Sequence, residues 1–423
     1  MSVASPPRRG FLSTGVPPVR RFARTTPGIL IVITLMIVAS CTVAAAVSVT
    51  GLQHRIAAHH NVLRHSEPFV FAAQNLYAAL SEADATAATA FLSGGIQTPA
   101  MRERYDQSLA AAASALADVT TGAGDLGVRT AVAEITVQLS TYTGLVEAAR
   151  VNNLRNYPVG SAYLREASSL MQTRLLPGAK GILDDGLAAL NLQQASIGVL
   201  PLSGLVLLGL VVVEVAAASA LLLLRTNRQF NVGLIAAAGF AVLAILSMLV
   251  ATRLAADDID RGHAAGIHRF ERLATARINA QQARTDETLE LIARSDVTDF
   301  ERDYADHIGR LLAALGSGPQ STVDAVGRWV ASHDTQVRAY RGGDFATAMA
   351  QAIGSDPDAS PAQFRVVETG LATEIDQTRT VMREAVSSAG AALTWTPVAV
   401  IVSATLAAAA ATAGMWPRLK EFL

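Results

Sequence analysis

Four long stretches with almost no charged side chains constrain the fold more than any other feature of this sequence. They span Gly28–Val49, Ile197–Leu224, Val232–Thr252 and Leu393–Met415. A helix rises about 1.5 Å per residue and the hydrocarbon core of a bilayer is about 30 Å thick, so roughly 20 apolar residues suffice to cross it. The sequence therefore predicts an all-α, multi-pass membrane protein with four transmembrane helices.

Composition agrees with this reading. The chain is 51% hydrophobic and only 16% charged, which is unusual for a soluble protein. A formal net charge of -1 argues against nucleic acid as a partner, because a nucleic-acid-binding surface needs an excess of cations. The single cysteine, Cys41, excludes an intramolecular disulfide and a metal site built from cysteines alone.

The flanking cations predict the orientation, because Lys and Arg near short loops stay on the cytoplasmic side. Arg8, Arg9, Arg20, Arg21 and Arg24 precede the first span, Arg225 and Arg228 lie between the second and third, and Arg418 and Lys420 follow the fourth. Both termini are therefore expected in the cytoplasm.

The predicted parts, in order, are a cytoplasmic tail (1–27), a first span (28–49), an outside domain (50–196), a second span (197–224), a cytoplasmic link (225–231), a third span (232–252), a second outside domain (253–392), a fourth span (393–415) and a cytoplasmic stub (416–423).

The cytoplasmic segments are too short to fold into a kinase or a cyclase, since a domain needs about 50 residues to bury a core. Any output must therefore pass to another protein, and the four cations Arg225, Arg228, Arg418 and Lys420 are the docking candidates.

The first span has a second interpretation. Val38-Ala39-Ser40-Cys41 fits the small-residue pattern of a lipoprotein cleavage site. The apolar run continues beyond it through Val47, which favours an uncleaved anchor. Whether Cys41 is a cleavage site stays open, and the first domain lies outside in either case.

The two halves of the chain repeat with an offset of about 200 residues, which predicts a tandem duplication of one module in the same orientation. Short matches support the repeat: His60-x4-His65 with His263-x4-His268, Asp84-Ala85-Thr86 with Asp286-Glu287-Thr288, and Arg104-Tyr105 with Asp303-Tyr304.

Each outside segment is expected to be helical, because no period-two stretch is long enough for a sheet. The first segment has breakers at Gly94-Gly95 to Pro99, Gly122-Ala123-Gly124 and Asn156-Tyr157-Pro158, which divide it into four helices. The second has breakers near Arg294–Asp299, Gly316–Pro319, Gly342–Asp344 and Ser355–Pro361, which give four helices and one short one. The sequence thus predicts two extracytoplasmic antiparallel four-helix bundles.

An acidic residue falls on the predicted buried stripe of the first long helix. Leu63, Val70, Tyr77 and Phe91 recur at seven-residue intervals, and Asp84 takes the missing position. A buried carboxyl is ordinarily a hydrogen-bonded structural group, and the alternative is a ligand or coupling site. The ligand or coupling candidates in the two modules are Asp84, Thr86 and Tyr105, and Asp286, Thr288 and Tyr304.

The sequence offers no catalytic or cofactor pattern. HExxH, GxxxxGK[ST], GxSxG and CxxC are absent, so neither an enzyme nor a cofactor is expected. The histidine pairs are spaced by five residues, about 140° apart on a helix, and one pair cannot hold a metal ion from one helix face. No metal site is predicted: these histidines are interpreted as solvated residues next to the membrane, and a proton or metal sensor is the minor alternative.

Glu214 lies inside the second span, where an ionised side chain costs on the order of 3 kcal/mol. Hydroxyls at comparable depth, among them Ser40 and Ser247, could pair with it. We interpret Glu214 as a protonated group that joins helices, and a transport pathway is the alternative.

The layout of a span, a four-helix bundle and a second span is similar to the sensing half of bacterial chemoreceptors and sensor kinases. Several segments more closely resemble the actinobacterial GlnX family: Asp84–Gly95, Arg102–Asp106, Tyr142–Arg150, Tyr163–Ser168 and Asp286–Arg294. That resemblance implies two partners: an extracytoplasmic amino-acid-binding lipoprotein that senses aspartate and glutamate, and a cytosolic Ser/Thr protein kinase.

Our leading hypothesis is a transmembrane signal relay that passes extracytoplasmic nutrient status to a cytosolic partner, and the family resemblance implies that the nutrient is an amino acid. The rivals are a transporter or permease component and an envelope scaffold that does not switch. The sequence leaves the ligand, its mode of binding and homo-oligomerisation open.

Overall fold

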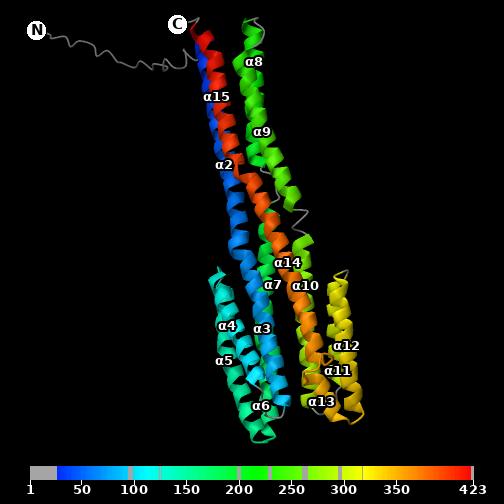
Figure 1. Cartoon of the computed structure of the whole chain (residues 1–423). Helices are drawn as coiled ribbons and strands as arrows, with labels where there is room; N and C mark the ends of the chain where they lie inside the picture. The colour runs from blue at the N-terminus through cyan, green and yellow to red at the C-terminus, as the bar shows by residue number, and fades with distance from the viewer. Residues whose placement is uncertain are drawn as a thin grey trace, which may run out of the picture. The chain divides into compact units, whose positions relative to one another are not determined.

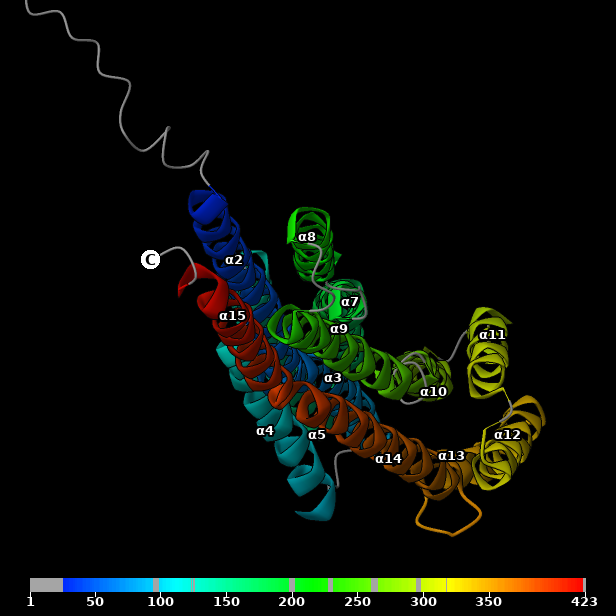
Figure 2. The same ribbon diagram turned by 90° about the horizontal axis from the view of Figure 1, so that it is seen from above.

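The computed structural model describes residues 26–93, 99–122, 124, 126–197, 202–226, 231–259, 265–293, 298–316 and 318–420. Every regular element in these ranges is helical (Figures 1 and 2), which confirms the predicted all-α class. The N-terminal cations, Arg228, His263 and the breakers at Gly94-Gly95 and Arg294 lie outside the described residues.

The chain divides into two compact units. The first, here called the span unit, comprises Met1–Ile56, Val199–Ala255 and Ala391–Leu423. The second, the large unit, comprises Ala57–Gly198 and Ala256–Gly390. Each unit thus contains sequence from both halves of the chain.

Four candidate membrane-spanning helices are found in the described residues, and their apolar parts lie in the span unit. The first candidate extends over Gly28–Leu92, a continuous helix whose later part belongs to the large unit. The four apolar parts belong to α2 (Thr26–Asn61), α8 (Leu202–Thr226), α9 (Val232–Ile259) and α15 (Thr396–Lys420). This confirms four apolar helices of spanning length, as expected for a multi-pass membrane protein. The fourth begins three residues later than predicted, at Thr396, where Pro397 suits the first turn of a helix because its missing N–H would have no helical partner there.

The spans pack through one stripe each, with buried residues three and four positions apart. In α2 the stripe includes Ile37, Cys41, Ala44 and Ser48, each at most 2% exposed. In α8 it is Leu208, Val211, Val215, Ala218 and Leu222. Large apolar side chains on other faces, such as Leu35 at 64% exposed, point away from the protein. This is the pattern expected of helices surrounded by lipid, with packing spaced as in coiled coils.

The backbones of α9 and α15 approach closely where two glycines meet. A Cβ at Gly233 would lie 2.4 Å from the Cα of Gly414 and 2.5 Å from the carbonyl oxygen of Ala410. The side-chain amide of Asn231 fixes this end, donating to the carbonyl oxygen of Gly414 at 2.9 Å. The small residues Gly233, Ala237 and Ala241 therefore face the packed side of α9.

The first part of the large unit contains α3 (Glu67–Leu92), α4 (Pro99–Gly122), α5 (Leu126–Leu154), α6 (Val159–Leu170) and α7 (Leu176–Ile197). A π-helical turn, Met171–Leu175, joins α6 to α7 as one helix, and another, Val62–Ser66, joins α2 to α3. The second part contains α10 (Ala265–Ala293), α11 (Thr298–Leu315), α12 (Gln320–Arg341), the short α13 (Phe345–Ile353) and α14 (Ser360–Thr394). The described turns fall at predicted breakers, and Asn156, Gly316 and Gly343 there have positive φ.

The two sets of helices in the large unit share one hydrophobic cluster instead of burying separate cores. Helix α3 packs against α4 and α7 on its own side and against α10 of the second set. Polar contacts reinforce this junction: Arg277 donates to the side-chain oxygen of Gln74 at 3.1 Å, and Arg379 forms an ion pair with buried Glu67. The guanidinium of Arg379 also lies 4.0 Å from the ring centre of Phe71.

Candidate functional site

Asp84 lies in the middle of α3, and its residue is 1% exposed. Its Oδ1 accepts hydrogen bonds from the hydroxyls of Tyr142 (3.2 Å) and Ser168 (2.9 Å), and its Oδ2 accepts one from the amide of Gln172 (3.4 Å). Burial raises the pKa of Asp84 to about 6, although these hydrogen bonds lower it. All three partners are neutral, so nothing in direct contact offsets the cost of burying a negative charge.

Next to this cluster is a cavity of about 270 Å³, here called the Tyr105 pocket. Its floor is apolar, with Val146, Ala149 and Leu164 all at most 7% exposed. Its polar lining consists of Arg102, Tyr105, Asp106, Glu147, Arg150 and Asn153, from α4 and α5. This size is near the lower end of ligand pockets, which suits a small molecule.

Some polar groups of the Tyr105 pocket have hydrogen-bond partners within the described part of the protein, and one does not. Arg150 donates to Glu147 at 3.1 Å, and Asn153 donates to the carbonyl oxygen of Phe91 at 2.9 Å. The hydroxyl of Tyr105 is buried with no hydrogen-bond partner among the described residues. Burial, followed by the charges of Glu147 and Asp84, raises the pKa of Tyr105. A buried neutral hydroxyl without a partner is a candidate contact for a ligand.

Local chain geometry brings α5 and α6 together at this site. The chain turns at Asn156, which has φ 56°, and the N–H of Tyr157 bonds back to the carbonyl oxygen of Asn152 at 2.9 Å. Gly160 then lets α6 approach α5, because a Cβ there would lie 3.1 Å from the carbonyl oxygen of Ala149. Four segments that carry the family resemblance supply residues to this region: Asp84–Gly95, Arg102–Asp106, Tyr142–Arg150 and Tyr163–Ser168.

The arrangement can bind a small polar ligand that carries both charges. Arg102 and Arg150 offer donors for a carboxylate, Asp106 and Glu147 offer acceptors for an ammonium group, and Tyr105 offers a hydroxyl. An amino acid has this combination of groups.

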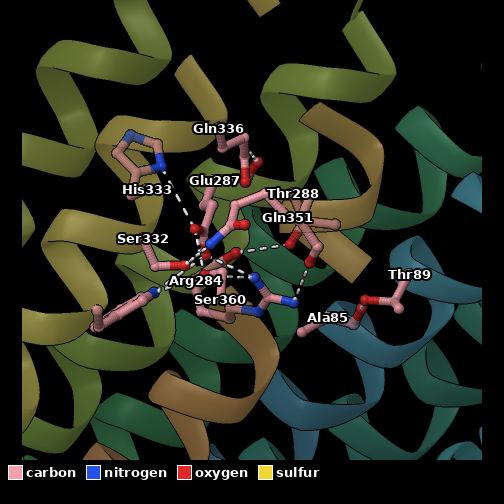
Figure 3. A network of polar contacts seen from close by, with 12 residues as sticks. Ala85, Thr89, Arg284, Glu287, Thr288, Ser332, His333, Gln336, Gln351 and Ser360 are labelled. Atoms are coloured by element: carbon pink, nitrogen blue, oxygen red, sulfur yellow. Dashed lines mark hydrogen bonds and ion pairs between the residues drawn. The ribbon is translucent and has the colours of Figure 1, made fainter. Parts of the chain in front are cut away.

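The second part of the large unit contains a different buried acid, Glu287 of α10 (Figure 3). Its carboxylate accepts from Arg284 at 2.6 Å, from the indole N–H of Trp329 at 3.2 Å and from the hydroxyl of Ser360. The Nδ1 atom of His333 lies 3.4 Å from Glu287 Oε1. Residues of three helices, α10, α12 and α14, thus converge on one carboxylate.

Charge pairing decides the electrostatics of this network. Burial alone raises the pKa of Glu287, but Arg284, His333 and Ser360 outweigh it and lower the pKa to about 2. Burial alone lowers the pKa of His333, but its contacts with Glu287 and Glu301 raise it to about 9. The ring of His333 is further held by Tyr304, which stacks on it at a centroid distance of 3.8 Å.

The remaining ligand or coupling candidates are placed apart from the Tyr105 pocket. Thr86 and Thr288 each bond to a carbonyl oxygen one turn earlier in their own helices, which is a structural role. Asp286 is partly buried beside His307, whose Nδ1 lies 2.8 Å from its Oδ2, and burial raises its pKa. The structure therefore joins Asp84 with the Tyr105 region, and Tyr304 with the Glu287 network.

Glu214 of α8 accepts a hydrogen bond from Ser40 of α2 at 3.1 Å, within the span unit. Lys420 is exposed, with its Nζ 5.8 Å from the ring centre of Trp416. Arg225 and Arg418 lie in helices whose side chains at these positions are outside the described part, as is the whole of Arg228.

Several residues of these sites were not singled out from the sequence: Tyr142, Ser168, Gln172, Glu147, Asn153, Arg284, Glu287, Trp329, His333 and Ser360. Apart from the pairs Arg284–Glu287 and Glu147–Arg150, which lie within one helix, the contacts join helices distant in sequence. The signal that could have found part of them is the motif Tyr142–Arg150, which runs directly into the pocket.

Comparison with known proteins gives one match. Residues 58–195 match the family model described as an actinobacterial sensor domain. No curated protein and no solved structure matches the chain. The matched residues include every residue of the Tyr105 pocket and the partners of Asp84. A sensor domain indicates a role in sensing or signalling, and the match supports an actinobacterial sensor protein.

Proposed function

We propose that this protein is a transmembrane sensor and relay, which reports extracytoplasmic amino-acid status to a cytosolic partner. The observation that carries the proposal is a small pocket with groups of both charges, lying entirely inside the residues that match a sensor domain. The apolar spans supply the route across the membrane, and packed helices of this kind switch by shifts of about 1–2 Å.

The proposed topology keeps both termini in the cytoplasm, with residues 50–196 and 253–392 outside as copies of one four-helix module. The orientation is supported by the cations that flank the spans, and the duplication by the repeated sequence matches. We also propose a non-enzymatic protein whose output is the binding of a partner at the inner cations, because the sequence contains none of the catalytic motifs considered above.

The nature of the partners rests on the resemblance to the GlnX family. It favours an extracytoplasmic solute-binding lipoprotein and a cytosolic Ser/Thr protein kinase. The Tyr105 pocket adds a direct route for a ligand, in which Arg150 contacts a carboxylate after releasing Glu147 to an ammonium group.

The test is binding of L-glutamate and L-aspartate to the full-length protein in detergent or nanodiscs, by isothermal titration calorimetry. Arg150→Ala should weaken binding more than about tenfold, since a charge-assisted contact is worth roughly 1.5–3 kcal/mol. Arg165→Ala is the matched control, because Arg165 is exposed on α6 and does not line the pocket. Equal affinities of the wild type and Arg150→Ala would contradict a ligand site at this pocket.

Transport is the second candidate, and Glu214 is the residue that favours it. Its hydrogen bond to Ser40 fits a group that joins two helices. Uptake of labelled glutamate by proteoliposomes that contain only this protein would overturn the relay in favour of transport.

A further inference from the structure

Three metal-ligating side chains converge in the second part of the large unit, outside the residues that match the sensor domain. Glu290 of α10, Glu301 of α11 and His333 of α12 each offer one ligand atom, and these atoms all lie within 4.8 Å of one another. Nε2 of His333 is 3.3 Å from Oε1 of Glu301. Ligands of a tetrahedral ion at metal–ligand distances of about 2.1 Å are roughly 3.4 Å apart, so small side-chain movements suffice.

The cluster is buried and its polar atoms are unsatisfied. Glu290 is 1% exposed and the side chain of His333 is 4% exposed. Glu290 Oε1, Glu301 Oε1 and His333 Nε2 have no hydrogen-bond partner among the described residues. Glu301 Oε1 and His333 Nε2 face each other as an ion pair at 3.3 Å, whereas Glu290 Oε1 has no such contact among the described residues. Buried polar atoms normally have hydrogen-bond partners, so the three atoms together indicate a missing one.

A carboxylate lies where it can orient His333 as a ligand, although Nδ1 of His333 forms no hydrogen bond with it in the structure. Its Nδ1 lies 3.4 Å from Glu287 Oε1, on the opposite side of the ring from the cluster. Glu287 is itself held by Arg284 and Trp329, as Figure 3 shows for Arg284. A metal-bound histidine characteristically donates its other ring N–H to a carboxylate, which fixes the tautomer and aims the free nitrogen at the ion.

We propose that Glu290, Glu301 and His333 form a binding site for a divalent transition-metal ion such as Zn²⁺. Two carboxylates and one imidazole are suitable ligands for such an ion, and three protein ligands leave a further position for water. The side chain of Glu301 is 24% exposed, which provides a path for entry. The ion would tie α10, α11 and α12 together.

The rival explanation is a metal-free ion-pair cluster, in which an imidazolium at His333 neutralises Glu287 and Glu301. The two explanations differ in what Glu290 does. A metal site needs the carboxylate of Glu290 as a ligand. The metal-free cluster depends on the ion pairs of His333 with Glu287 and Glu301, which a glutamine at position 290 leaves in place.

The test uses the full-length protein in detergent, stripped with EDTA and then mixed with Zn²⁺ or Co²⁺ alone. The readouts are metal content after gel filtration and the visible absorption of bound Co²⁺. The variants are Glu290→Gln and Glu301→Gln, which keep size and hydrogen-bonding capacity. The control is His307→Gln, because His307 of α11 pairs with Asp286 of α10 and is not one of the three cluster residues. Circular dichroism checks that each variant is folded.

The proposal expects the wild type and His307→Gln to retain a single ion per chain. Each glutamine variant should bind the metal ion more than about tenfold more weakly than the wild type. It should also lose the visible absorption of Co²⁺ bound at a four- or five-coordinate site. Absence of bound metal in the wild type, or equal affinity in the wild type and both glutamine variants, would overturn it. Amino-acid binding at the Tyr105 pocket is measured separately, so failure of one proposal leaves the other standing.

Discussion

Two carboxyl groups, Asp84 and Glu287, are both fully buried yet have opposite electrostatic behaviour. Asp84 accepts hydrogen bonds from neutral groups, and burial raises its pKa to about 6. Glu287 contacts Arg284 and His333, which overcome burial and lower its pKa to about 2. The difference lies in the charge of the partners and not in the degree of burial.

The raised pKa of Asp84 predicts a pH effect on stability. Its folded pKa of about 6 exceeds the ordinary value of 3.8, so the folded state binds the proton more tightly. The stabilisation from the protonated carboxyl is complete below about pH 3.8 and is lost as pH rises through about 6. Asp84→Asn mimics the protonated form, so its melting temperature relative to wild type should rise between pH 4 and pH 7. A difference that does not change with pH would show that Asp84 is ionised throughout.

The buried pair Arg284–Glu287 predicts a large loss on truncation. Arg284→Ala should lower the free energy of unfolding by about 3–5 kcal/mol, because it leaves the charge of Glu287 buried without its main partner. Arg310→Ala removes an exposed pair with Asp306 and should change stability little. Chemical denaturation in detergent measures both. Similar small effects of the two substitutions would mean that Glu287 has other sufficient partners.

At the scale of single residues, the sequence predicted part of the candidate site around Asp84. The seven-residue series correctly placed Val70, Tyr77 and Asp84 in the interior, where each is at most 2% exposed. It did not extend to Leu63, because the π-helical turn at Val62–Ser66 adds a residue to the turn and buries Val62 instead. In the second half Asp286 is only partly buried, whereas its neighbour Glu287 is fully buried, because a single step rotates a side chain by about 100° on a helix.

At the scale of helices, the spans and the described breakers were predictable, because both depend on local sequence. The packing of α3 on α10 was not predicted. Helix α3 is rich in alanine and buries residues on nearly all faces, including Ala72, Ala73, Ala78 and Ala79. Such a helix has no single apolar stripe to show which neighbours it contacts.

The contact between α9 and α15 predicts that one glycine is essential and another is not. Gly233→Ala should lower the melting temperature of the detergent-solubilised protein, because its Cβ would lie 2.4 Å from Gly414 Cα, and backbone must move. Gly239→Ala, in the same helix, meets no atom within 4 Å and should be neutral or slightly stabilising, since alanine favours the helix. Equal melting temperatures for both variants would contradict the close approach of these helices.

For the whole molecule, the proposed topology gives a labelling pattern. In a Cys41→Ser background, a membrane-impermeant maleimide should label Leu126→Cys in intact cells, because Leu126 is 77% exposed in a part proposed to lie outside. Lys420→Cys should be labelled only after the membrane is opened. Labelling of Lys420→Cys in intact cells would place the C-terminus outside and reverse the topology.

The proposed relay connects a ligand pocket, in the residues that match a sensor domain, to the segments proposed to lie in the cytoplasm. A ligand can bias such a protein only by binding one arrangement of the helices more tightly than another. A relay and a scaffold therefore differ in one property, which is whether the inner ends of the spans move when the pocket is filled.

The most direct test is the distance between spin labels at positions 225 and 420, measured by pulsed electron paramagnetic resonance with and without saturating L-glutamate. The protein carries Cys41→Ser, so that only the two labelled positions are cysteines, and is reconstituted in nanodiscs. The relay predicts a shifted distance distribution on ligand binding, and no shift in a protein that also carries Arg150→Ala. An unchanged distribution in protein shown by calorimetry to be saturated with ligand would contradict the relay.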